Sequence, residues 1–132
     1  LRMATLYQVA SANKGIVVGT GNKVEDFGVG FYTKYGDGGV DISPLADCTK
    51  TEIWELGREL GVIKEIIDAQ PTDGLWDDGR TDTGQLGLTY QELEDAMINE
   101  NSKNRKKYLE IRKLNLHKID SIPVCKIPKT NE

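Results

Sequence analysis

The sequence predicts an α/β fold, with a parallel sheet and flanking helices. A helical pattern over residues 2–13 precedes a short run of β-branched residues at 16–18, which is the order of half an α/β unit. Two later helices open on Thr-x-x-Glu capping boxes, at Thr49 and at Thr89. Long glycine-rich loops separate these elements, and such loops in compact domains are usually functional or disordered.

The first helix and the strand are predicted from apolar spacing. Four side chains over residues 2–13 recur at helical spacing: Met3, Leu6, Tyr7 and Ala10. We expect that face of the helix to be buried. The run at 16–18 is bounded by glycines and is typical of a buried strand in a parallel sheet. Residues 21–48 lack periodicity and are predicted as a loop with a helical turn at 24–27.

The second helix is predicted from its capping box, in which Thr49 is the N-cap and Glu52 stands at the third helical position. Its apolar face comprises Ile53, Leu56, Gly57 and Leu60. Gly61 ends this helix. Residues 63–68 are expected to form a short helix or turn, and residues 69–88 a second long loop.

The C-terminal third is predicted to be helical and basic. The capping box at Thr89 opens a helix that runs to about Asn99, with Leu88 and Leu93 as a hydrophobic staple. Residues 102–118 are predicted as a basic helix, and residues 119–132 as an irregular tail.

Composition limits the class of protein. The 132 residues are 38% hydrophobic and 29% charged, and no apolar run approaches the ~18 residues that span a bilayer. Cys48 and Cys125 have no neighbouring cysteine, so both are expected to be free thiols in a reducing compartment. The sequence therefore predicts a cytoplasmic protein with no membrane partner.

Charge is unevenly distributed along the chain. Residues 1–100 hold 18 acids and 8 bases, a net of −10, whereas residues 101–132 hold 3 acids and 9 bases, a net of +6. The basic end is either a polyanion-binding tail or a solvated helix face that offsets the acidic body. Because the chain is acidic overall and its basic helix carries only Tyr108 as an aromatic platform, no nucleic-acid partner is expected.

Two stretches carry candidate chemistry. Residues 19–25, GTGNKVE, follow the predicted strand, where glycine amides could approach a phosphate and Glu25 could hold Mg²⁺. The alternative is a tight turn before a helix. Residues 31–41, FYTKYGDGGVD, combine three aromatics, a lysine and two carboxylates, which suits a nucleotide ring, a phosphate and a ribose. Here the alternative is an ordinary Gly-Asp-Gly-Gly turn.

These two stretches belong to one longer motif, residues 19–53, GTGNKVEDFGVGFYTKYGDGGVDISPLADCTKTEI. It resembles the signature of ammonia-dependent NAD+ synthetases, an FTKYGDGG-type loop followed by D-[IL]-x-P-[LI] and a capped helix. The match continues through residues 70–75 and 86–90 and reaches His117 and Lys118. The chain thus resembles the C-terminal portion of such an enzyme along essentially its whole length.

The resemblance implies an adenine nucleotide alpha-hydrolase-like (ATP pyrophosphatase) fold, with residues 1–132 as the C-terminal part of a single synthetase domain. It implies a homodimeric ligase that converts deamido-NAD+ into NAD+ with ATP, ammonia and Mg²⁺, through an adenylated nicotinate. The pyrophosphate-binding loop of the family, S-G-G-[IV]-D-S, does not occur in these residues, so this segment alone is expected to be inactive. The alternative is a catalytically inactive nucleotide-binding or dimerisation fragment.

The resemblance also implies residue roles, while no catalytic residue is assigned. The residues expected to bind ATP are Thr20, Lys50 and Thr72. Those expected to bind deamido-NAD+ are Lys34, Asp41, His117 and Lys118. Glu25 is expected to bind Mg²⁺. Structural alternatives are surface charges for Lys50 and Lys118, a turn for Thr72, and a packed or exposed histidine for His117.

The chain departs from the family pattern at three places. The stretch from Glu25 to Lys34 is one residue longer than in many bacterial members. Thr83 stands where many members carry an acid, so it receives no role. Arg2 lies beside the position of a substrate-binding arginine and does not inherit that function.

Overall fold

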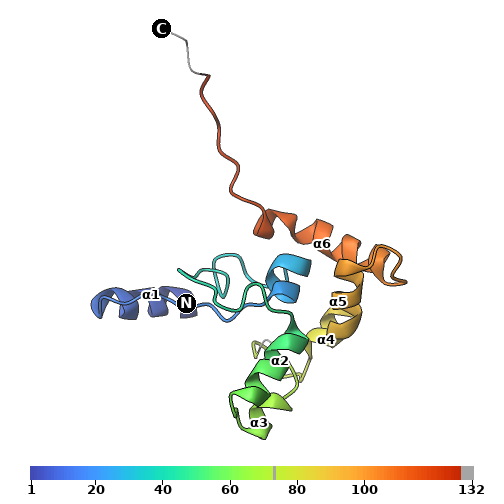
Figure 1. Cartoon of the computed structure of the whole chain (residues 1–132). Coiled ribbons are helices and arrows are strands. Elements are labelled where there is room, and N and C mark those ends of the chain that lie inside the picture. Colours follow the sequence, from blue (N-terminus) through green and yellow to red (C-terminus); the bar gives the residue numbers. More distant parts are fainter. Residues whose placement is uncertain (73, 129–132) are drawn as a thin grey trace.

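The structure, a computed structural model, describes residues 1–72 and 74–128 as helices joined by long loops (Figure 1). The helices in chain order are α1 (Arg2–Ala12), η1 (Lys23–Val29), α2 (Lys50–Glu59), α3 (Lys64–Ile67), α4 (Asp82–Leu86), α5 (Tyr90–Ile98) and α6 (Arg105–Ile119). The element η1 is a π-helix. No helix within the described ranges is long and apolar enough to cross a membrane.

The core forms where α5 and α6 pack against η1. Its buried side chains come from these three elements and from α4 and the residues that follow it: Val24, Val29, Leu86, Leu88, Tyr90, Leu93, Ala96 and Tyr108. Val24, Val29, Leu93 and Ala96 are 0% exposed. The two residues of the predicted staple, Leu88 and Leu93, both lie in this cluster, so the start of α5 is fixed by apolar packing as well as by its cap.

The predicted strand at 16–18 makes only one parallel β-bridge, between Val18 and Ile42. Around it, the amide of Gly19 donates to the carbonyl of Ile42 at 2.7 Å, and the amide of Asp41 donates to the carbonyl of Val17 at 2.9 Å. The two segments therefore run side by side in the direction expected of a parallel sheet. Within the described residues no longer strand forms, so the sheet itself remains a prediction.

Helix α1 is confirmed, but the prediction that one of its faces is buried is wrong. None of its residues is buried, and Leu6 and Val9 are 55% and 50% exposed. The helix projects away from the core (Figure 1), and its contacts with the rest of the chain include Met3 beside Gly39. Helical spacing defines an apolar face, but burial needs a second surface, and the loop around Gly39 and Asp41 covers this face only in part.

The region predicted as a loop at 69–88 contains one further helix, α4. Thr81 is its N-cap and accepts a hydrogen bond from the amide of Gly84, while Gly87 ends it with a φ of 65°. A five-residue helix is too short for apolar periodicity to reveal it. Helix α3 is confirmed as a short element inside 63–68. The irregular tail is confirmed as far as residue 128; residues 129–132, like Asp73 in the matched 70–75 stretch, lie outside the described residues.

Cations of α6 stabilise the C-terminal ends of neighbouring helices. Arg105 donates to the carbonyls of Ala96 and Met97 at 2.6 and 3.2 Å, at the end of α5. Lys107 donates to the carbonyl of Gly87, the C-cap of α4, at 2.5 Å. The last carbonyls of a helix lack intrahelical partners and carry partial negative charge, which a cation stabilises. Part of the positive charge of residues 101–132 is therefore structural.

Candidate nucleotide-binding site

The π-helix η1 carries the candidate metal ligand Glu25. Its N-cap, Asn22, is 1% exposed, and its Oδ1 accepts hydrogen bonds from the amides of Val24 and Glu25, each at 3.0 Å. At the other end Gly30 closes the helix in the left-handed region, at φ 67°. An asparagine N-cap and a left-handed glycine thus fix both ends of the element that presents Glu25.

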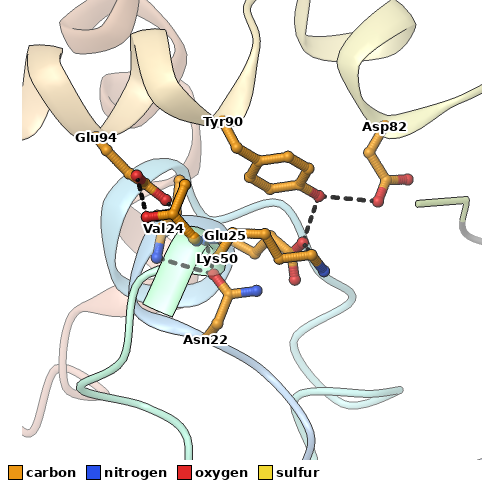
Figure 2. A network of polar contacts seen from close by, with 8 residues as sticks. Asn22, Val24, Glu25, Lys50, Asp82, Tyr90 and Glu94 are labelled. Carbon is orange, nitrogen blue, oxygen red and sulfur yellow. Dashed lines mark hydrogen bonds and ion pairs between the residues drawn. The ribbon is translucent and has the colours of Figure 1, made fainter. Parts of the chain in front are cut away.

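Glu25 and Lys50 lie together (Figure 2). The family resemblance implies a metal-binding role for the first and an ATP-binding role for the second. Lys50 Nζ is 3.1 Å from Glu25 Oε1, and the two side chains are 20% and 17% exposed. The hydroxyl of Tyr90 donates to the same Glu25 oxygen and lies 3.1 Å from Asp82 Oδ2. Four polar side chains from η1, α2, α4 and α5 therefore meet at one point beside the core.

Tyr90 is the most enclosed member of this group. It is 2% exposed, and burial, followed by the nearby carboxylates of Glu25 and Asp82, raises the pKa of its phenol well above the usual value. The phenol is therefore neutral at physiological pH. With a single proton it donates to one of the two carboxylates at a time. Lys50 Nζ lies 5.1 Å from the centroid of the ring, a cation–π contact that adds to the ion pair.

Lys50 is the first residue of α2, and contacts on both sides hold it. Thr49 completes the predicted capping box, since its hydroxyl accepts from the amide of Glu52 and its own amide donates to Glu52 Oε2 at 2.7 Å. On the other side, the amide and hydroxyl of Thr51 donate to the two carboxylate oxygens of Glu94, at 3.0 and 2.7 Å. The start of α2 is therefore tied to α5.

A second cluster brings together three of the four residues assigned to deamido-NAD+. Lys34 Nζ donates to the carbonyl of His117, and Lys118 Nζ donates to the carbonyl of Gly30 at 2.9 Å. Tyr32 donates its hydroxyl to the carbonyl of Lys118 at 2.5 Å, and its ring centroid lies 5.7 Å from Lys118 Nζ. The loop that begins at residue 31 is thus fastened to the last turn of α6 within one chain.

The three aromatics of the 31–41 stretch have different surroundings. Phe31 packs against the core, and Tyr32 lies over Gly38, where an added Cβ would be 2.5 Å from the ring. Tyr35 is 64% exposed, and Lys34 Nζ lies 5.9 Å from the centroid of its ring. Only Tyr35 therefore offers a largely open ring for stacking, and Gly38 is required because of the approach of Tyr32.

The remaining predicted residues lie apart from these clusters. Asp41 accepts from the amide of Val17 at 2.7 Å and from the hydroxyl of Tyr7 at 3.3 Å, so it ties the 16–18 segment to α1. Thr20 and Thr72 are exposed in loops. The structure thus joins Glu25 with Lys50 and joins Lys34 with the end of α6, while Asp41, Thr20 and Thr72 belong to neither cluster.

The donor set suits a magnesium ion that is shared with a nucleotide. Magnesium is usually held by one or two carboxylates together with phosphate oxygens and water. Within residues 1–72 and 74–128 no three histidine, cysteine or acidic side chains gather closely enough to hold a metal by themselves. Glu25, which is partly buried beside a lysine, fits a site in which one carboxylate shares the ion with phosphate oxygens and water. It does not fit a site whose ligands all come from the protein.

Sequence reasoning missed four residues of this arrangement: Asn22, Asp82, Tyr90 and Glu94. A helix N-cap could have been inferred for Asn22, since asparagine preceding a helical turn is a common cap. Tyr90 and Glu94 are four positions apart in a helix that was predicted, and that spacing places them on one face. Nothing local linked either of them to Glu25 or Lys50.

These features define a class of protein. A capped helix presents a carboxylate beside a lysine at its start, and Lys118 of α6 reaches its other end at Gly30. Lys34 of the glycine-rich aromatic loop bonds to the carbonyl of His117, next to Lys118. Such an arrangement of cations is suited to a phosphorylated nucleotide. Comparison with known proteins identifies the family. The NAD synthase family model matches residues 1–132, and the chain belongs to the NAD synthase family.

Curated relatives and solved structures agree with this assignment. The NH(3)-dependent NAD(+) synthetase of Carboxydothermus hydrogenoformans is 46% identical over 98 residues, 74% of this chain and 40% of that protein. That of Methanosarcina acetivorans is 41% identical over 122 residues, 92% of this chain and 47% of that protein. The chain therefore spans somewhat less than half the length of these relatives.

Two solved structures share the fold. An NMN synthetase from Francisella tularensis superposes with a TM-score of 0.86 at 36% identity, over 96% of this chain and 53% of that one. The NH3-dependent NAD synthetase of Campylobacter jejuni, solved with nitrate, has a TM-score of 0.64 at 21% identity, over 95% and 52%. The latter shows the fold alone. The chain thus has the fold of part of these synthetases, which confirms the expected fold class in outline.

Proposed function

We propose that this chain supplies part of the active site of a ligase that amidates deamido-NAD+ to NAD+ with ATP and ammonia. The observation that carries the proposal is the position of two charged clusters at opposite ends of η1. Glu25 and Lys50 lie at its start. Lys118 donates to the carbonyl of Gly30 at its end, and Lys34 donates to the carbonyl of His117, the residue before Lys118. One helix thereby joins a triphosphate-binding cluster to a cluster for the acid substrate.

The reaction needs an activated carboxylate, because the nicotinate group is a poor electrophile at neutral pH. A carboxylate oxygen attacks the α-phosphorus of ATP, and the bond to pyrophosphate breaks, which gives an acyl adenylate. Ammonia then attacks the acyl carbon, the bond to AMP breaks, and the nitrogen loses a proton to give the amide. Such a reaction depends mainly on positioning and on stabilising charge.

In this scheme Lys50 supports the triphosphate and Glu25 holds the ion that accompanies it. Magnesium, when bound, would neutralise charge on the phosphates as pyrophosphate leaves. What supports this role is that Glu25 and the Tyr90 ring hold the ammonium of Lys50 in one place, which reduces the reorganisation needed to meet a phosphate oxygen. Thr20 and Thr72, on exposed loops, are proposed as further ATP contacts.

The acid substrate is proposed to bind at the other end of η1. Lys34, His117 and Lys118 would meet its carboxylate and phosphates, and Asp41 would accept hydrogen bonds from ribose hydroxyls. We further propose a cytoplasmic homodimer in which the remainder of the site comes from the rest of the synthetase domain. The free thiols Cys48 and Cys125 are compatible with a reducing compartment.

A second acid substrate calls for a direct test. The solved structure with a TM-score of 0.86 is an NMN synthetase, whereas the curated relatives are NAD synthetases. The mononucleotide acid would carry the same nicotinate carboxylate and one phosphate without the adenosine half. The proposed cluster of Lys34, His117 and Lys118 could serve either substrate.

The decisive experiment measures amide formation by the full-length protein that contains these residues, with ATP, ammonia and magnesium. Deamido-NAD+ and nicotinate mononucleotide are compared by kcat/KM. We expect deamido-NAD+ to be preferred and AMP to be released in equal amount with the product. Glu25→Ala should abolish turnover, whereas Glu59→Ala, on an exposed position of α2, should not. A protein that binds ATP but amidates neither acid would refute the proposal and favour an inactive nucleotide-binding or dimerisation fragment.

A further inference from the structure

Helix α5 supports the residues that the proposed function uses, without being one of the segments assigned to substrate. Tyr90 and Glu94 are four residues apart on this helix and so lie on one face. Figure 2 shows both side chains reaching from α5, Tyr90 toward Glu25 and Glu94 toward the start of α2. Tyr90 contacts Glu25 directly, whereas Glu94 contacts Thr51, the residue after Lys50.

Tyr90 fixes the carboxylate of Glu25. Its hydroxyl donates to Glu25 Oε1, the same oxygen that accepts from Lys50. The ring itself cannot move easily, because it is 2% exposed and meets Trp54 edge to face, with centroids 5.7 Å apart and planes at 85°. A rigid phenol therefore holds one oxygen of Glu25 in place from the core side.

Glu94 fixes the backbone that carries Lys50. Its two oxygens accept the amide and hydroxyl of Thr51, at 3.0 and 2.7 Å. The amide of Thr51 is one of the first amides of α2, which have no partner within their own helix. The capping box between Thr49 and Glu52 already anchors the residue before Lys50. Lys50 is thus held between an anchor within α2 and an anchor from α5.

We propose that Tyr90 and Glu94 are positioning residues that set the direction of Glu25 and the place of Lys50 for a magnesium-bound triphosphate. This inference rests on the proposed function, since it assigns the roles of metal and phosphate contact to Glu25 and Lys50. In this proposal both residues act through Glu25 and Thr51 and not on the substrate itself. Their effect is on how tightly and in what geometry the ion and the nucleotide are bound.

The test uses Tyr90→Phe and Glu94→Gln in the full-length protein that contains these residues. Phenylalanine keeps the ring and its contact with Trp54 and removes only the hydroxyl. Partners that orient a metal ligand typically change metal affinity by about 10- to 100-fold when removed. We therefore expect Tyr90→Phe to raise the half-saturating magnesium concentration about tenfold, with the KM for deamido-NAD+ unchanged.

Glu94→Gln should weaken the binding of ATP. Because glutamine offers one acceptor oxygen instead of two, one of the bonds from Thr51 is lost and the start of α2 loosens. We expect the KM for ATP to rise on the order of tenfold, since small displacements of positioning groups are costly. A readout that does not depend on turnover is calorimetric titration with magnesium and a non-hydrolysable ATP analogue. The measured binding affinity should be lower in both variants.

The matched control is Tyr108→Phe. Tyr108 is buried in the same cluster, at 5% exposure, but the hydrogen bonds of the described residues do not connect it with Glu25 or Lys50. The Tyr108→Phe variant should have the same half-saturating magnesium concentration and the same KM for ATP as the unaltered protein. Unchanged magnesium and ATP curves in both α5 variants, or an equal shift in Tyr108→Phe, would overturn the proposal. Failure of the unaltered protein to form NAD+ would defeat the proposed function instead, while calorimetry would still report on the positioning.

Discussion

Replacing Gly30 with alanine tests how closely η1 packs against α6. Gly30 has a φ of 67°, in the left-handed region, and an added Cβ would lie 2.5 Å from the Cβ of Asn115 on α6. The matched control is Gly61→Ala, because Gly61 has a φ of 71° and nothing within 4 Å of an added Cβ. Both variants place a non-glycine residue at a positive φ, but only Gly30→Ala also brings a methyl group too close to Asn115.

The expected magnitudes follow from these two terms. A non-glycine residue in the left-handed region costs about 1–2 kcal/mol, so Gly61→Ala should lower the free energy of unfolding by roughly that amount. Overpacking typically costs a further ~1–3 kcal/mol. Gly30→Ala should therefore lose about 2–5 kcal/mol in total.

Urea unfolding of the full-length protein, followed by circular dichroism, measures both changes. The clash also has a functional consequence, because Lys118 donates to the carbonyl of Gly30 and would move with α6. Gly30→Ala should therefore weaken binding of deamido-NAD+ as well, whereas Gly61→Ala should not. Equal losses of stability in the two variants would show that Gly30 does not meet α6 at this distance.

Three further changes test other parts of the structure. Arg112 donates to the carbonyls of Phe27 and Gly28 at the end of η1. Arg112→Ala should therefore lower the free energy of unfolding in urea by about 1–2 kcal/mol. A loss below roughly 0.5 kcal/mol would show that these hydrogen bonds do not stabilise the fold. Burial, then the charges of neighbouring carboxylates, raises the pKa of Asp26 from 3.8 to about 6. The folded protein thus binds this proton more tightly, so the protonated Asp26 contributes stability that is lost as pH rises from about 4 to 6. In magnesium-free buffer Asp26→Asn should therefore gain melting temperature relative to the unaltered protein as pH rises across this range; a constant difference would exclude the contribution of Asp26. Thr89→Ala, which removes the N-cap of α5, should cost about 1 kcal/mol, and an unchanged melting temperature would count against the cap.

The starts of α2 and α5 could be predicted well, because capping uses atoms that are adjacent in the sequence. Both capping boxes form as predicted, at Thr49 and at Thr89. The family could also be predicted, because the motif that carries the resemblance is one contiguous stretch, residues 19–53. Residues Glu25, Lys34 and Lys50 all lie within that motif, so this part of the candidate site could be located from the order of the residues alone.

The exposed face of α1 and the short helix α4 show where local patterns fail. Spacing can identify an apolar face, but whether it is buried depends on what packs against it. Helix α4 is held by its Thr81 cap and by Leu86 in the core, in a stretch whose glycines and aspartates indicated only a loop. The burial of α1 depends on partners outside the window in which periodicity is read, and α4, with five residues, is shorter than that window.

The sequence by itself determined the family, the starts of α2 and α5 and the identity of the charged residues around η1. Only the tertiary structure decided that Tyr90 would donate to Glu25 across 65 positions, and that Arg112 would donate to Phe27 across 85. The physical reason is that a cap depends on the conformation of a few consecutive residues. A contact across such a distance forms only when core packing compensates for the entropy of closing the intervening loop, and no local pattern records that balance.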